Sequence, residues 1–209
     1  PLAISQDEWF AISNSLEEHH AVFYRVWQMG KPNFTDMVET AGIQFNEAGD
    51  FIHFHFNPNF WLTLDHYNKL FVICHEALHV ILNHGVRACS DRMNQRASNA
   101  AMDVVINHLL LRSFNFDRKK IINAEKLCWV DTVFAAKNPL PPDDEMFEYY
   151  YNLFDRMYGD GAPGEGTSGD GSNEMGGMSN GEGTVDDHSF MGEKSDDWES
   201  VQEKLNEEL

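Results

Sequence analysis

The chain has 209 residues, of which 42% are hydrophobic and 12% aromatic, so it is long and apolar enough for one domain with a sizeable core. Its formal net charge is -19, because 34 acidic residues stand against only 15 basic ones. Residues 143–209 alone carry 19 of the acidic and 3 of the basic residues. Such a charge disfavours binding to nucleic acid and to anionic membrane surfaces.

The three cysteines, Cys74, Cys89 and Cys128, cannot all pair with one another, and none stands in a CxxC spacing. No charged-then-apolar leader opens the sequence, so we expect a cytoplasmic protein with reduced thiols.

The longest apolar stretch, residues 70–82, is interrupted by two histidines and a glutamate. It is therefore too short and too polar to cross a bilayer.

A helix is predicted near the N-terminus, where Ser5 and Glu8 form a capping box ahead of apolar residues that continue to Trp27. Gly30 and Pro32 are expected to end this helix, because glycine and proline are typical helix terminators.

Two short strands are predicted next, over residues 42–46 and 50–56, joined by turn residues as a hairpin. In the second strand, apolar residues alternate with His53 and His55. This alternation indicates a half-buried strand, which we place at the edge of a small sheet.

Further helices are predicted over residues 64–84, 91–112 and 143–157. Residues 159–195, rich in glycine and acidic side chains, are interpreted as a flexible linker, and residues 196–209 as an acidic helical stub. We therefore expect a compact domain over residues 1–158. Its fold class is α+β, mostly helical, with a small N-terminal hairpin or sheet packed on the 64–84 helix.

The strongest chemical signal is the motif His75-Glu76-Ala77-Leu78-His79 inside the 64–84 helix. Positions i and i+4 share one helical face, so both imidazoles can reach a single Zn²⁺ ion. Glu76 would then act as the general base that takes a proton from a water at the metal. The alternative is a pair of core histidines beside a solvated glutamate.

A third zinc ligand is needed, and Asp103 is the preferred candidate. Burying a carboxylate in the middle of an otherwise apolar helix is unfavourable unless the carboxylate binds a cation. Asn99 and Asn107 flank it at i-4 and i+4, which gives that helix a polar stripe. His84 is nearer in sequence, but it follows His79 by five residues and would point to another side of a continuing helix.

Two alternatives remain open on this helix. Asp103 could instead form a structural ion pair with Arg87, Arg92 or Arg96. His108 is a weak candidate for polarising a substrate carbonyl.

Three sequence blocks carry a family resemblance: residues 56–60, residues 70–87 around the motif, and residues 99–107. Over residues 1–158 the chain resembles the metallopeptidase domain of the predicted metal-dependent peptidases. The resemblance implies a zincin-like fold, zinc on His75 and His79, and an acidic third ligand that Asp103 matches most simply. Members often accompany MoxR-type ATPases, which implies such a partner.

The chain departs from related patterns in two places. In HtpX-type and CAAX prenyl endopeptidases, which have a similar histidine spacing, the third ligand is a glutamate at the position held here by Asn99. Members of the resembled family typically continue into a von Willebrand A-like domain, for which the residues after Asp196 are too few. We therefore expect a fragment or a shortened relative.

Zincins commonly bind substrate as an added strand along a sheet edge above the motif helix. The 50–56 strand is the natural candidate, with His53 or His55 near the cleft, although a solvated strand face is the simpler interpretation of these histidines.

The sequence thus predicts a cytoplasmic zinc-dependent peptidase that acts on a peptide or protein substrate, with Glu76 as its base. A non-catalytic scaffold module, stabilised by a structural zinc ion, is the alternative.

Overall fold

The computed structural model describes residues 3–45, 52–82 and 93–159. His84 and residues 160–209 lie outside the described residues, so the predicted linker, the acidic stub and the proposed ligand role of His84 stay predictions. The elements are α1 (Gln6–His19), α2 (Ala21–Gln28), β1 (Gly30–Phe34), β2 (Ala41–Phe45), β3 (Ile52–Phe56), α3 (Pro58–Thr63), α4 (His66–Ile81), α6 (Gln95–Phe114), α7 (Val130–Val133) and α8 (Phe147–Gly159).

The N-terminal helix begins as the capping box predicts, with the Ser5 hydroxyl accepting a hydrogen bond from the Glu8 amide at 3.2 Å. The prediction of one continuous helix to Trp27 is wrong, because His20 adopts non-helical dihedrals (φ -145°, ψ 57°) and separates α1 from α2. The His20 ring stacks on Phe116, with ring centroids 5.1 Å apart. The break therefore coincides with a tertiary contact that the N-terminal sequence alone does not reveal.

The sheet has the strand order β1-β3-β2. β2 and β3 pair antiparallel, which confirms the predicted strand pair, whereas β1 pairs with β3 in parallel. The prediction that the 50–56 strand lies at an edge is wrong, because β1 covers its second side. β1 was not expected, since Pro32 lies in it; proline is tolerated there because β1 is an outer strand.

Gly30 is required where β1 meets β3, for a steric reason. A Cβ atom at this position would come within 2.4 Å of the Phe54 ring and within 3.0 Å of the Ile52 carbonyl oxygen. Only glycine lets the first residue of β1 approach the central strand this closely.

α4 is the central element of the fold. Its N-terminus is capped by Asp65, whose carboxylate accepts a hydrogen bond from the Asn68 amide at 2.8 Å. Every residue from Leu70 to Val80 is buried. α2 and β2 pack on α4 from the N-terminal part of the chain, and α6 packs on it from the C-terminal part.

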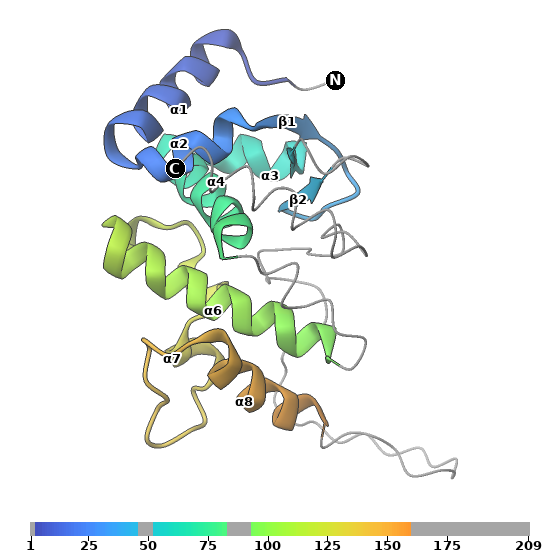
Figure 1. Cartoon of the computed structure of the whole chain (residues 1–209), viewed down its shortest axis with the longest axis vertical. Coiled ribbons are helices and arrows are strands. Elements are labelled where there is room, and N and C mark those ends of the chain that lie inside the picture. The colour runs from blue at the N-terminus through green and yellow to red at the C-terminus, as the bar shows by residue number, and fades with distance from the viewer. Residues whose placement is uncertain (1–2, 46–51, 83–92, 160–209) are drawn as a thin grey trace.

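The helices form successive layers, with α4 followed by α6 and then α8 (Figure 1). One hydrophobic cluster surrounds α4, the sheet and the N-terminal helices, and a second lies between α6 and α8. This arrangement confirms the predicted class: mostly helical, α+β, with a small N-terminal sheet packed on the motif helix. Within the described part of the chain, no helix is long and apolar enough to cross a membrane.

Candidate metal centre

Three side chains from two helices converge in the interior: His75 and His79 from α4 and Asp103 from α6. The two histidine Nε2 atoms lie 3.1 Å apart, and each lies 3.6 Å from the same Asp103 carboxylate oxygen, Oδ1. All three residues are buried, with relative exposures of 1%, 0% and 4%. The face shared by positions i and i+4 of α4 therefore meets a carboxylate on the next helix, as the sequence predicts.

The cluster fits a small tetrahedral cation. Zinc bonds of about 2.0–2.1 Å place neighbouring ligand atoms of a tetrahedron roughly 3.3–3.4 Å apart. The three separations of 3.1, 3.6 and 3.6 Å in the cluster bracket that value. Two imidazoles and one carboxylate also form one of the three-ligand sets found in catalytic zinc sites, where a fourth position takes water or substrate.

Within the described ranges, these three residues are the one group of His, Cys, Asp or Glu side chains close enough to share an ion. Arg96, one of the alternative partners considered for Asp103, has its guanidinium 4.8 Å from the centre of the Tyr158 ring. Arg87 and Arg92, the other two, lie outside the described residues. The geometry therefore groups Asp103 with the two histidines of the motif.

Glu76, the predicted general base, is fully buried on α4 directly after His75. Burying a carboxylate in the apolar core of a helix bundle is costly unless it is paired or has a chemical role. Glu76 therefore follows the first histidine of the cluster in sequence and lies in the same buried stretch of α4.

Asn107, one of the polar residues around Asp103, lies against the cluster. Its Oδ1 atom lies 3.0 Å from His75 Nδ1, and its Nδ2 atom donates a hydrogen bond to the Cys128 carbonyl at 3.2 Å. Asn99, in contrast, is half-buried near the start of α6, where its Oδ1 accepts a hydrogen bond from Gln95. The hydrogen bond from Asn107 to the Cys128 carbonyl could not be predicted from the sequence, because every residue has a backbone carbonyl.

His108 follows Asn107 but belongs to a different contact. Its Nε2 atom accepts a hydrogen bond from the Val130 amide at 3.1 Å, and its Nδ1 atom lies 3.7 Å from Asp143. Burial lowers the pKa of the His108 imidazole, and the nearby Asp143 carboxylate opposes that shift. His108 therefore contacts the segment after Cys128 and is not part of the His–His–Asp cluster.

His53 and His55 lie on the central strand and are not part of the His–His–Asp cluster. His55 Nδ1 accepts a hydrogen bond from Asn33 Nδ2 at 2.9 Å, and His55 Nε2 donates one to Gln44 Oε1 at 3.0 Å. Burial, and secondarily the neighbouring His53, lowers the pKa of His55. His55 therefore cross-links the three strands through neutral amides.

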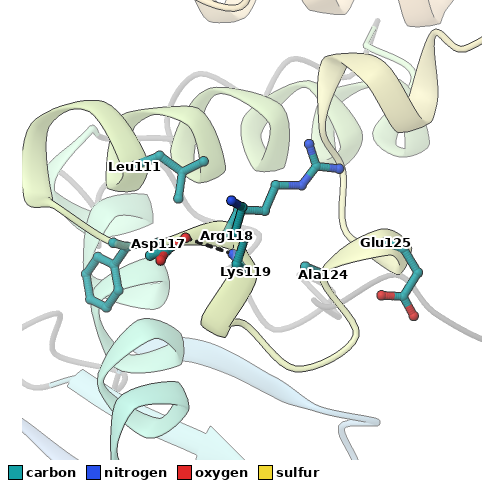
Figure 2. Close-up of a pocket in the computed structure, with 7 residues that line it drawn as sticks. Leu111, Asp117, Arg118, Lys119, Ala124 and Glu125 are labelled. Carbon is teal, nitrogen blue, oxygen red and sulfur yellow. Dashed lines mark hydrogen bonds between the residues drawn. The ribbon is translucent and has the colours of Figure 1, made fainter.

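A hollow of about 640 Å³ opens at the C-terminal end of α6 (Figure 2). Its lining residues are Leu111, Phe116, Asp117, Arg118, Lys119, Ala124 and Glu125. Arg118 is held there by Asp131, with both carboxylate oxygens 2.9 Å from its Nη1 atom, and its guanidinium lies over the Trp129 ring. The hollow shares no residue with the His–His–Asp cluster.

A family model described as a putative metallopeptidase domain matches residues 29–208. No curated protein and no solved structure gives a significant match. The matched range contains the whole buried cluster and begins directly after the N-terminal helix pair, α1 and α2.

Proposed function

The chain belongs to the putative metallopeptidase domain family, and we propose from this premise that it is a zinc-dependent peptidase. The observation that carries the proposal is the convergence of His75, His79 and Asp103 from two helices, with the buried Glu76 next to the first ligand. This combination is what hydrolysis of a peptide bond by metal-assisted chemistry requires.

His75 and His79 would hold the ion through Nε2, and Asp103 through Oδ1, since these are the atoms that converge. A zinc ion there would supply a Lewis acid that polarises the substrate carbonyl and makes water more acidic. The burial of the cluster limits competition from bulk water for these ligand atoms.

Glu76 is the proposed general base. It accepts a proton from the water that attacks the peptide carbonyl, and it then donates that proton to the leaving amine nitrogen. A carboxylate fixed on the motif helix suits both proton transfers. It keeps its position while the water attacks and the carbonyl carbon changes from planar to tetrahedral. This role goes beyond a structural metal site, which needs no base.

The substrate is proposed to bind as an added strand along β2, rather than along the predicted 50–56 strand, which is β3. β3 is enclosed by two neighbours, whereas β2 is an outer strand of the described sheet and packs on α4. An extended peptide could therefore add to the sheet beside the motif helix. Backbone N-methylation of a cleaved peptide should then abolish its cleavage, whereas recognition by side chains alone would tolerate the methyl groups.

The test is turnover of a broad peptide library by the purified, zinc-loaded chain, followed by mass spectrometry. Glu76→Gln should keep the metal and lose roughly 10²–10⁴-fold in turnover, the contribution typical of a general base. Glu125→Gln, the same carboxamide substitution at an exposed position outside the His–His–Asp cluster, is the matched control. Equal turnover in the Glu76→Gln variant and the wild-type chain would refute the proposed mechanism.

A zinc-stabilised scaffold is the second candidate, and the near-complete burial of the cluster favours it, since structural sites are closed. It predicts that chelation unfolds the chain while no peptide is cleaved with zinc present.

A MoxR-type ATPase partner stays a prediction from the family resemblance, to be tested by co-purification.

A further inference from the structure

We propose that Asn107 is a positioning residue that holds the His75 ring with its proton on Nδ1 and its Nε2 atom free of a proton. The inference rests on the metal site of the proposed function. It concerns the ring orientation and tautomer of one ligand, which neither the motif nor the family match assigns.

The orientation of the Asn107 amide follows from its second contact. The Cys128 carbonyl oxygen can only accept a hydrogen bond, and it lies 3.2 Å from Nδ2 of Asn107. The amide nitrogen is therefore directed at Cys128, which leaves Oδ1 as the atom that faces His75, at 3.0 Å from its Nδ1.

The tautomer of His75 follows from the amide. An amide oxygen only accepts hydrogen bonds, so Nδ1 of His75 must carry the proton. A neutral imidazole has one N–H group, so Nε2 is then the unprotonated atom. That atom lies 3.1 Å from His79 Nε2 and 3.6 Å from Asp103 Oδ1, at the centre of the cluster.

The anchor of the amide is itself well fixed. Beside Cys128, the Trp129 indole donates to the Ala124 carbonyl at 2.6 Å, and its ring meets the His108 ring edge-on. The next amide, of Val130, donates to His108. Consecutive residues of α6, Asn107 and His108, therefore each hold one backbone group of this segment.

Burial gives the contact its strength. Asn107 and His75 are each 1% exposed, so bulk water has little access to either partner. Removing the acceptor would leave the His75 ring free to rotate or to adopt the other tautomer. Loss of such an outer partner of a ligating histidine typically costs 10–100-fold in metal affinity.

Two substitutions separate positioning from a merely structural role. Asn107→Asp keeps an acceptor for His75 and loses the donor to Cys128, whereas Asn107→Leu loses both. By competition with a chromogenic chelator, zinc affinity should fall about 10–100-fold in Asn107→Leu. It should stay within a few-fold of wild type in Asn107→Asp and in the control Asn152→Leu, at an exposed position of α8. Unchanged affinity in Asn107→Leu, or equal losses in the Leu and Asp variants, would overturn the proposal.

A second readout needs neither a variant nor activity. In ¹⁵N NMR spectra of the full metal-free chain at about pH 8, where an unperturbed imidazole is neutral, His75 should show the Nδ1–H tautomer. An Nε2–H signature would overturn the proposal. Zinc binding by the wild-type chain is scored separately, so that a failure to bind zinc would refute the proposed function while the NMR spectrum still decides the role of Asn107.

Discussion

A histidine pair on α4 and another on β3 each have their rings close together. The ring centroids of His75 and His79 are 5.0 Å apart, and those of His53 and His55 are 6.0 Å apart. The helical pair meets the Asp103 carboxylate from the adjacent helix. The pair on the strand has a similar distance between its rings, but neither of its histidines belongs to the His–His–Asp cluster.

The neighbours of each ring explain this difference. Both ring nitrogens of His55 are engaged by neutral amides, Asn33 on Nδ1 and Gln44 on Nε2. In His75 the amide of Asn107 engages Nδ1, and Nε2 faces the other two candidate ligands. Histidine spacing alone is therefore a weak guide to a metal site. An adjacent carboxylate and one correctly directed nitrogen per ring are the decisive features.

The largest expected effect comes from truncating one histidine of each pair. His75→Ala should abolish stoichiometric zinc binding, a loss greater than the roughly 10–100-fold that changes around a ligand cause. His55→Ala should leave the zinc content of the folded chain unchanged. Elemental analysis after dialysis, with folding checked by circular dichroism, measures both. The comparison would fail if the two variants lost zinc equally.

A second substitution perturbs the sheet alone. Gly30→Ala should lower the free energy of unfolding by about 1–3 kcal/mol, the usual effect of overpacking, because its Cβ would approach the Phe54 ring to 2.4 Å. Denaturant titration measures this, with Lys31→Ala as the neighbouring exposed control. Zinc bound per folded chain should not change, and a parallel loss of zinc would show that the two regions are not independent.

The smallest effect is a pH dependence of stability. Burial lowers the pKa of His55, as it does for His20 and His108. Below the unfolded-state pKa of 6.5 the unfolded chain binds more protons at these sites, so the free energy of unfolding should fall as pH drops from 6.5 towards the folded-state values. Thermal melts at several pH values measure this slope. His55→Gln should reduce it, and an unchanged slope would contradict the role assigned to His55.

The parts of the fold that depend on local contacts could be predicted. The Ser5 cap, the 64–84 helix and the antiparallel pair of β2 and β3 each follow from neighbouring residues. β1 could not, because its parallel partner β3 lies about twenty residues away and Pro32 argues against a strand. The mistaken edge position of β3 follows from missing that partner.

Much the same division holds for the site. The convergence of His75 and His79 could be predicted from helical spacing, and that of Asp103 from a carboxylate in an apolar helix, which are local features. The role of Glu76 as a base stays a prediction. The contact of Asn107 with His75 could not be predicted, because it depends on the position of α6 against α4 and on a backbone carbonyl.

The central claim is that His75, His79 and Asp103 form one metal site. X-ray absorption at the zinc edge of the full chain, loaded with one equivalent of zinc, tests it most directly. The account predicts a first shell of nitrogen and oxygen only, with scattering from two imidazoles, and loss of the bound zinc in His79→Ala, as in His75→Ala. A sulfur shell, which would implicate a thiol such as that of the buried Cys74, or failure to retain zinc would contradict it.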